Sequence, residues 1–248
     1  DDVINAAEQG DVVVSGIAEA GSTVEIVFTD GAGATVVESA IANGTGVWTL
    51  TGSEVDLTGL ADGSITVAAT ATDAAGNESP AGSVTVTKDA AVPAAPAVPD
   101  LDAASDTGPS DSDDITSDTT PTLSGTGGTD GDTVTLYADG TPVGTATVQP
   151  GGSYSVTPTV PLGDGTPALT VTFTDPSGNE SDPSPALSVP IDATVPTTPA
   201  APDLDAASDT GPSDSDDITS ETTPPQTGTG GDEGDTGAHY ADGTAVGN

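Results

Sequence analysis

One stretch of 19 residues occurs twice in this chain, and it constrains the fold more than any other feature. Pro99–Ser117 and Pro202–Ser220 have the same sequence, and their starts lie 103 residues apart. A second motif returns at nearly the same distance, because Asp73-Ala-Ala-Gly-Asn-Glu-Ser and Asp175-Pro-Ser-Gly-Asn-Glu-Ser begin 102 residues apart. Repetition at a fixed long period is the signature of an array of one structural unit. The 248 residues therefore predict two and a half copies of a small domain.

The period sets the expected domain boundaries. Repeat 1 spans residues 1–90, and repeat 2, with a Pro-rich linker and an acidic segment ahead of it, spans residues 91–195. The third copy, residues 196–248, stops in mid-repeat, so we interpret the sequence as an internal piece of a longer chain. It also loses apolar side chains, because Gln226, Gly237 and His239 replace Leu123, Val134 and Leu136. We therefore expect residues from about 221 onward to be poorly ordered.

Short runs of alternating apolar residues predict β-strands in repeats 1 and 2. Val24, Ile26 and Phe28 fall on one face by a period of two, and Trp48 and Tyr154 occupy matching core positions. Short strands with turn residues between them are typical of an antiparallel sandwich. We expect an all-β chain of tandem Ig-like antiparallel β-sandwich domains with a truncated third copy. The expected strands are 11–16, 22–28, 35–40, 46–50, 64–72, 83–87, 121–126, 133–137, 141–148, 153–156, 169–174 and 186–191.

Charge and composition exclude several classes of function. Forty acidic residues face one Lys and no Arg, which gives a net charge of −39. Nucleic-acid binding needs a basic patch and is therefore excluded, and anionic membranes are disfavoured. Without Cys the chain has no disulfides or thiolate metal sites, and no apolar run is long enough to insert into a membrane. The single His239 has no partner for a catalytic triad, so we do not expect an enzyme.

Carboxylates are expected to gather where the linker meets repeat 2. In an immunoglobulin-like strand order, the loops 127–132 and 175–180 share the pole where the chain arrives from repeat 1. Clustered carboxylates repel each other unless a cation lies among them, and Ca²⁺ suits oxygen ligands in flexible loops. A solvated, turn-rich acidic loop is the alternative. The candidate calcium ligands on this reasoning are Asp89, Asp100, Asp102, Asp130, Asp132 and Asp175.

The repeated acidic segment is a second candidate metal site. A turn at Gly108-Pro109 is expected to fold Asp106 back towards Asp111 and Asp113. The spacing is not that of an EF-hand, because the sixth-position Gly and the twelfth-position Glu are missing. In the third copy, Asp203 and Asp205 stand at the positions of Asp100 and Asp102.

Several motifs together resemble a known family. They are the Pro-rich linker, DLDAASDTGPSDSDDIT, TTPTLSGTG, Leu136-Tyr-Ala-Asp-Gly140 and Asp175-Pro-Ser-Gly-Asn-Glu-Ser. This set is similar to the bacterial Ig-like repeats of giant surface adhesins and biofilm-associated proteins. The resemblance implies a calcium-rigidified extender region, secreted by a type I system and displayed on a Gram-negative cell surface. It also implies ligand positions at Asp73, Asn77, Asp175, Asn179, Asp89 and Asp192.

Two functions remain open at the level of sequence. The first is a structural extender whose partners are neighbouring repeats of the same chain, with calcium stiffening each joint and an adhesive tip held away from the cell. The alternative is a carbohydrate- or cell-binding Ig-like module. Sugar sites usually use exposed aromatic side chains, and this chain has one Trp, three Tyr and two Phe.

Overall fold

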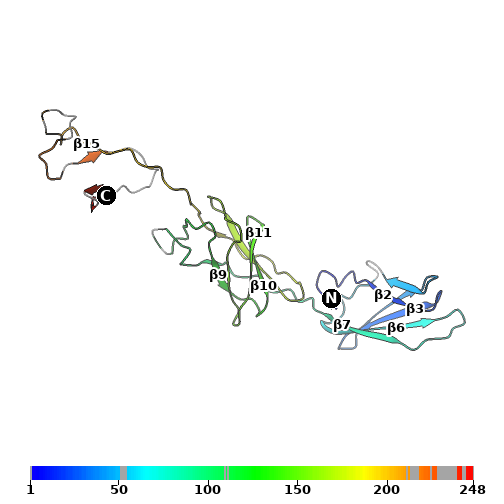
Figure 1. Cartoon of the computed structure of the whole chain (residues 1–248). Coiled ribbons are helices and arrows are strands. Elements are labelled where there is room, and N and C mark those ends of the chain that lie inside the picture. The colour runs from blue at the N-terminus through cyan, green and yellow to red at the C-terminus, as the bar shows by residue number, and fades with distance from the viewer. Residues whose placement is uncertain are drawn as a thin grey trace. The chain divides into compact units, whose positions relative to one another are not determined.

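The computed structural model describes most of repeats 1 and 2 and parts of the third copy. The described residues are 2–50, 55–108, 110, 112–210, 212, 218–223, 225–227, 239–241 and 244–247. Every regular element among them is a β-strand (Figure 1). The chain divides into two compact units, residues 1–192 and 193–248, and the first holds both complete repeats. The predicted all-β fold class is confirmed.

Repeat 1 is a sandwich of two sheets. One sheet has the order β1-β7-β6-β3-β4, and the other pairs β2 with β5. Alternation places one face of each strand inward, so Val24, Ile26 and Phe28 of β3 are all buried, as predicted. The strands are β1 (Val3–Ile4), β2 (Val14–Ile17), β3 (Thr23–Thr29), β4 (Thr35–Ile41), β5 (Val47–Leu50), β6 (Gly63–Thr72) and β7 (Gly82–Lys88).

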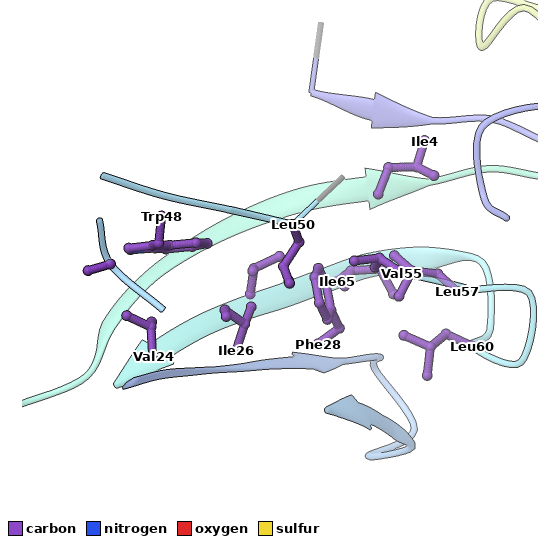
Figure 2. Close-up of a cluster of buried hydrophobic side chains, with 12 residues drawn as sticks. Ile4, Val24, Ile26, Phe28, Trp48, Leu50, Val55, Leu57, Leu60 and Ile65 are labelled. Carbon is purple, nitrogen blue, oxygen red and sulfur yellow. The ribbon is translucent and has the colours of Figure 1, made fainter. Parts of the chain in front are cut away.

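The core of repeat 1 extends along the whole sandwich. Figure 2 shows Trp48 and Val24 at one end of the cluster and Leu57 and Leu60 at the other. Trp48 is only 6% exposed, which confirms its predicted place in the core.

Repeat 2 has a similar plan, with four strands in its first sheet and three in its second, where repeat 1 has five and two. The sheets have the orders β11-β10-β13-β14 and β12-β9-β8. Tyr154 is buried at the place that Trp48 holds in repeat 1 and meets Phe173 edge to face, with 5.6 Å between ring centroids. The strands are β8 (Asp100–Leu101), β9 (Leu123–Thr126), β10 (Thr133–Ala138), β11 (Thr141–Thr147), β12 (Ser153–Val156), β13 (Ala168–Thr174) and β14 (Leu187–Ser188).

Two short strands differ from the sequence expectation. β1 pairs with β7 in parallel, whereas an entirely antiparallel sandwich was expected. β8 forms inside the stretch interpreted as linker and acidic segment, where it pairs with β9. Both have only two residues, so they carry too little alternation to reveal a strand.

The second unit contains two short strand pairs in its described residues. β15 (Asp203–Leu204) pairs with β16 (Gln226–Thr227), and β17 (His239–Ala241) pairs with β18 (Thr244–Gly247). Much of the region expected to be poorly ordered lies outside the described residues, so that expectation stays a prediction. No helix in the described part of the chain is long and apolar enough to cross a bilayer.

Replacing Tyr154 with Phe should stabilise repeat 2. The hydroxyl is buried and has no hydrogen-bond partner among the described residues, and a buried unpaired polar group costs about 1–3 kcal/mol. Tyr154→Phe is expected to raise the free energy of unfolding by about 1 kcal/mol. Burial also raises the pKa of Tyr154 above 10. The stability that this tyrosine contributes is therefore complete below pH 10 and lost as pH rises beyond it, a loss that the Phe variant avoids.

Urea unfolding at pH 7 and above pH 10 measures both effects. Gly125→Ala serves as the opposing control, because its Cβ would collide with the Tyr154 ring and hydroxyl. Overpacking of this kind lowers stability by about 1–3 kcal/mol. A Tyr154→Phe variant that is less stable than the parent at pH 7 would show that the hydroxyl has a partner after all.

Candidate functional site

The same compact loop follows β6 in repeat 1 and β13 in repeat 2. In repeat 2, Asp175 Oδ1 accepts the Asn179 backbone N–H at 2.8 Å, and the Asn179 side-chain amide donates to Asp175 Oδ2 at 2.9 Å. Asp73 and Asn77 make the same two bonds in repeat 1, both at 2.8 Å. The bonds from Asn77 hold the pKa of Asp73 below its ordinary value of 3.8. The Asp-x-x-Gly-Asn motif thus closes its own loop through hydrogen bonds between Asp and Asn.

In repeat 2 this loop also contacts repeat 1. Asn179 Oδ1 accepts the backbone N–H of Ala6 at 2.7 Å, and its amide nitrogen donates to the carbonyl of Asp89 at 2.9 Å. The Ser177 hydroxyl donates to Asp89 Oδ2 at 2.7 Å. We call these four residues, Ala6, Asp89, Ser177 and Asn179, the junction contact. Asn179 is 3% exposed, whereas Asn77 is open to solvent.

Sequence reasoning identified half of the junction contact. It singled out Asp89 and Asn179, and it missed Ala6 and Ser177. A signal for Ser177 was present, because the corresponding residue of the repeat 1 loop is Ala75, so the two loops differ at this position. Ala6 contributes only its backbone N–H, so its residue type does not indicate the contact.

Asp130 and Asp132, two further predicted ligands, lie at the same end of repeat 2 as the Asp175–Asn179 loop. Thr133 of β10 pairs with Thr174 of β13, so the loops 127–132 and 175–180 share one end, here called the proximal pole. Asp132 is 2% exposed and accepts the Thr129 N–H at 2.8 Å within its own loop. Asp130 is exposed. The structure thus confirms the shared pole of these two loops.

The acidic segment lies at the other end of repeat 2, the distal pole. Thr116 forms a parallel bridge with Ile191, and the Asp192 N–H donates to the Thr116 carbonyl, where the chain leaves the repeat. Asp100 pairs with Ser124 of β9, and the Asp102 N–H donates to Thr122, further from the proximal pole. The expected convergence of Asp100 and Asp102 with the proximal loops is therefore not observed.

The acidic segment folds back on itself as predicted. The N–H of Gly108 donates to the Ile115 carbonyl, and the N–H of Asp114 donates to Asp106 Oδ2 at 3.2 Å. Asp106 is 7% exposed, and its Oδ1 has no hydrogen-bond partner among the described residues. Asp113, close by in the same loop, is exposed. Asp111, the third member of the predicted site, lies outside the described residues.

In the third copy, the acidic segment begins with the same turn as in repeat 2. Asp205 accepts the N–H of Ala207 at 2.9 Å, as Asp102 accepts that of Ala104 at 3.2 Å. Asp203 lies in β15, where it pairs with Thr227.

The two acidic regions differ in how well they fit a cation. No three acidic or histidine side chains in the described part of the chain gather closely enough to hold a metal ion. At the junction contact, the side-chain oxygens of Asp175 and Asn179 already accept hydrogen bonds. Each of these oxygens therefore already has one hydrogen-bond donor. Asp106 Oδ1 is the oxygen that a cation would satisfy, so the acidic segment is the better candidate.

The chain's one basic residue is used within repeat 1. Lys88 is 3% exposed, and its Nζ lies 2.7 Å from Asp62 Oδ1. The hydrogen bond from Lys88 holds the pKa of Asp62 below 3.8. In repeat 2 the corresponding position is Ile191, which is 2% exposed. The lysine therefore offers no charge to the junction.

Comparisons with known proteins agree with the repeat structure. A family model described as bacterial Ig-like domain matches residues 2–90 and 92–193. A tetra-tandem repeat from the extending region of a large adhesion protein is 32% identical, with 83% of this chain and 50% of that chain covered and a TM-score of 0.31. A 1.5-MDa bacterial ice-binding adhesin is 29% identical, with 77% and 62% covered and a TM-score of 0.39. The chain thus spans less than two thirds of either structure, and no curated protein matches it.

Proposed function

The chain belongs to the bacterial Ig-like domain family, and on that premise we propose that it is a run of extender repeats from a secreted, cell-surface adhesin. Its partners are then the neighbouring repeats of the same polypeptide, and its role is to hold an adhesive part away from the cell. The junction contact carries this proposal. It joins two repeats by direct hydrogen bonds through a loop that every complete repeat possesses.

Composition supports an extracellular spacer. A net charge of −39 keeps a long chain soluble and prevents its repeats from sticking to one another. The absence of Cys leaves the fold independent of the redox state of its surroundings. Stability then depends on the two apolar cores and on the junction, which suits a chain whose task is mechanical.

Calcium has a more specific place in this proposal than the sequence suggested. We assign it to the acidic segment at the distal pole, with Asp106 and its loop neighbour Asp113 as ligands. A bound Ca²⁺ would supply positive charge to a buried carboxylate oxygen that has no other described partner. Extracellular modules bind Ca²⁺ with dissociation constants of about 10⁻⁴–10⁻³ M. Asp89, Asp175 and Asn179 would then stabilise the joint by hydrogen bonding alone.

The test is a thermal and calorimetric comparison of Asp106→Asn with the parent chain. In EGTA, Asp106→Asn should raise the Tm by about 2–4 °C, because it removes an uncompensated buried charge. In millimolar calcium the parent chain should have the higher Tm. Calorimetry should then detect one calcium-binding event fewer in Asp106→Asn than in the parent chain. Asp73→Asn is the matched control, since its oxygens serve only their own loop. If the Tm values of the parent chain and the two variants had the same order with and without calcium, this metal site would be ruled out.

Small-angle scattering then tests the stiffening itself. If calcium fixes the joints, the maximum dimension of the full chain should be larger in calcium than in EGTA. An unchanged dimension, with calcium binding intact, would separate metal binding from any role in stiffening.

The alternative of a sugar-binding module receives little support from the aromatic side chains. Phe28, Trp48, Tyr154 and Phe173 are buried in the two cores. Tyr137 is half-buried and donates its hydroxyl to Glu180 at 2.9 Å. These five aromatic residues therefore offer no flat exposed surface on which a sugar ring stacks.

A further inference from the structure

Asn43 is the only asparagine in the sequence that a glycine follows. It begins the loop between β4 and β5, and Asn43, Gly44 and Thr45 are all exposed. An asparagine can react with its own backbone, because attack by the next peptide nitrogen on the side-chain amide carbon closes a five-membered ring. Gly44 has no Cβ to hinder this attack. The loop therefore holds a nucleophile and an electrophile side by side.

Three hydrogen-bond donors converge on the side-chain oxygen of Asn43. Its Oδ1 accepts the backbone N–H of Thr45 at 2.8 Å, that of Val47 at 3.1 Å, and the Thr45 hydroxyl at 2.7 Å. Attack on the amide carbon moves negative charge onto this oxygen. Removing one preorganised donor of this kind from an enzyme slows its reaction about 10²–10³-fold. The loop therefore stabilises the tetrahedral intermediate of the attack.

The attacking nitrogen and the leaving nitrogen are not held by the fold. Within the described part of the chain, neither the Gly44 N–H nor the side-chain NH₂ of Asn43 makes a hydrogen bond. The Gly44 nitrogen can lose its proton to water, and the amide nitrogen can leave as ammonia. Neither step breaks a hydrogen bond of the loop.

The other described asparagines lack this combination. The side-chain amide nitrogens of Asn77 and Asn179 each donate to the aspartate that begins their loop, so their leaving groups are held. Asn5 also has two backbone donors on its Oδ1. The nitrogen that would attack it belongs to Ala6, however, and donates to Asn179. Asn43 is therefore the described asparagine best placed to react.

The loop at Asn43 also suits an aspartate. Asp30 begins the loop between β3 and β4, and its Oδ1 accepts the N–H groups two and four residues further on, both at 2.9 Å. Asp73 does the same after β6, with both bonds at 2.8 Å. Asn43 accepts the N–H groups at the same two offsets. Because a carboxylate accepts hydrogen bonds more strongly than an amide oxygen, the loop can hold the aspartate product at least as well.

We propose that Asn43-Gly44 is a self-modification site, at which the chain converts asparagine to aspartate and isoaspartate without an enzyme. The Gly44 nitrogen bonds to Asn43 Cγ and gives up its proton, while the Cγ–Nδ2 bond breaks and the nitrogen leaves as ammonia. One water then opens the resulting succinimide ring. Opening at Cγ gives aspartate, and opening at the main-chain carbonyl gives isoaspartate. The conversion adds one negative charge, and it is independent of calcium and of the adhesin role.

The two products have different effects on repeat 1. Aspartate keeps the backbone of the loop unchanged. Isoaspartate directs the main chain through the former side-chain carbon and so adds one methylene group to it. This lengthening disturbs the bond between the Asn43 N–H and the Val47 carbonyl, 2.8 Å long, at the start of β5. The stability of repeat 1 should therefore fall as isoaspartate accumulates with the age of the molecule.

The test incubates the folded full chain at neutral pH and physiological temperature and then cleaves it after glutamate. The fragment Ser39–Glu54 contains Asn43 as its only asparagine and has no aspartate, so any aspartate or isoaspartate in it comes from this site. Chromatography with mass spectrometry separates the three forms. Asn43 should convert at least about tenfold faster than Asn77 and Asn179. The rate should rise with pH, because the attacking nitrogen must lose its proton.

Two substitutions of Thr45 form a matched pair that tests the donors. Thr45→Val keeps the backbone N–H and removes the hydroxyl, so conversion should slow about tenfold, less than in an enzyme because the loop is open to water. Thr45→Ser keeps a hydroxyl and should convert at the parent rate. Equal rates in Thr45→Val and the parent chain would overturn the role of the loop. Conversion of Asn43 no faster than that of Asn77 would overturn the site itself.

Asn43→Asp tests whether the loop accepts the product. Urea unfolding followed by Trp48 fluorescence should show repeat 1 at least as stable in this variant as in the parent chain. The isoaspartate form, isolated from the aged parent chain, should be less stable than both. A destabilised Asn43→Asp variant would contradict the fit of an aspartate to this loop.

Discussion

Replacing Asp62 with alanine is expected to lower the free energy of unfolding of repeat 1 by about 3 kcal/mol. Lys88 is 3% exposed, and Asp62 supplies its counter-charge at 2.7 Å. Removing one partner of a buried ion pair leaves the other charge uncompensated, which costs about 3–5 kcal/mol. The lower end of that range applies because the Asp62 side chain is 42% exposed, so water reaches the pair. Urea unfolding followed by Trp48 fluorescence measures the loss in repeat 1.

The matched variant removes the other partner. Lys88→Ile installs the residue that repeat 2 has at this position, Ile191, and leaves Asp62 free to hydrate. This variant should be as stable as the parent or more stable, because well-packed apolar residues often replace buried ion pairs without loss. If Asp62→Ala and Lys88→Ile lowered the free energy of unfolding equally, the loss would come from the missing ion pair. It would not come from a lysine charge left buried without its partner.

The same pair predicts a dependence on pH. The pKa of Asp62 is lower in the folded chain than in the unfolded chain because Lys88 donates a hydrogen bond to it. Its contribution is therefore present above the unfolded value of about 4 and is lost as pH falls through the folded value. Lys88→Ile should lose less stability than the parent between pH 5 and pH 2, about the range in which this carboxylate titrates.

The second large effect concerns the junction contact. Asn179→Ala removes the partners of the Ala6 N–H and the Asp89 carbonyl and also the local bond to Asp175. Asn77→Ala removes only the local bond to Asp73 in an otherwise equivalent loop. Each polar group left without a partner costs about 1–3 kcal/mol when it is shielded from water. We expect Asn179→Ala to lose about 2 kcal/mol more than Asn77→Ala.

Scanning calorimetry of the full chain, combined with Trp48 fluorescence, separates the unfolding of the two repeats. If the junction contact couples them, Asn179→Ala should also move the two transitions apart, whereas Asn77→Ala should leave their separation unchanged. Equal losses from the two substitutions would mean that the bonds between the repeats contribute nothing measurable. Ser177→Ala, which restores the residue found in repeat 1, should have a smaller effect in the same direction as Asn179→Ala.

The sequence predicted the fold well where side-chain alternation was long enough to detect. Val24, Ile26 and Phe28 alternate along β3, and the structure buries all three. The two-residue strands β1 and β8 were missed because their pairing depends on where the chain arrives and leaves, which is a property of topology. The buried position of Lys88 was also missed, because its partner Asp62 lies 26 residues away on a turn.

The sequence predicted which segments make up the candidate site, but it did not predict at which pole of repeat 2 each segment lies. Repetition identified the Asp175–Asn179 loop and the acidic segment, and strand order placed the loops 127–132 and 175–180 at one pole. The acidic segment lies at the opposite pole because β8 runs antiparallel to β9 and carries the chain away from the junction. Charge counting could not reveal this, since acidic residues occur at both poles.

The position of β8 within the duplicated stretch affects how a chain of this kind changes its length. Pro99–Ser117 and Pro202–Ser220 are identical, and each contains an Asp-Leu strand that pairs with the strand following the stretch. Because the two stretches are identical, a genetic crossover anywhere inside these 19 residues leaves the Asp-Leu strand and the sequence on either side of it unchanged. Such an event inserts or deletes one whole domain in frame and severs no hydrophobic core. The reach of the molecule can therefore evolve in steps of one repeat.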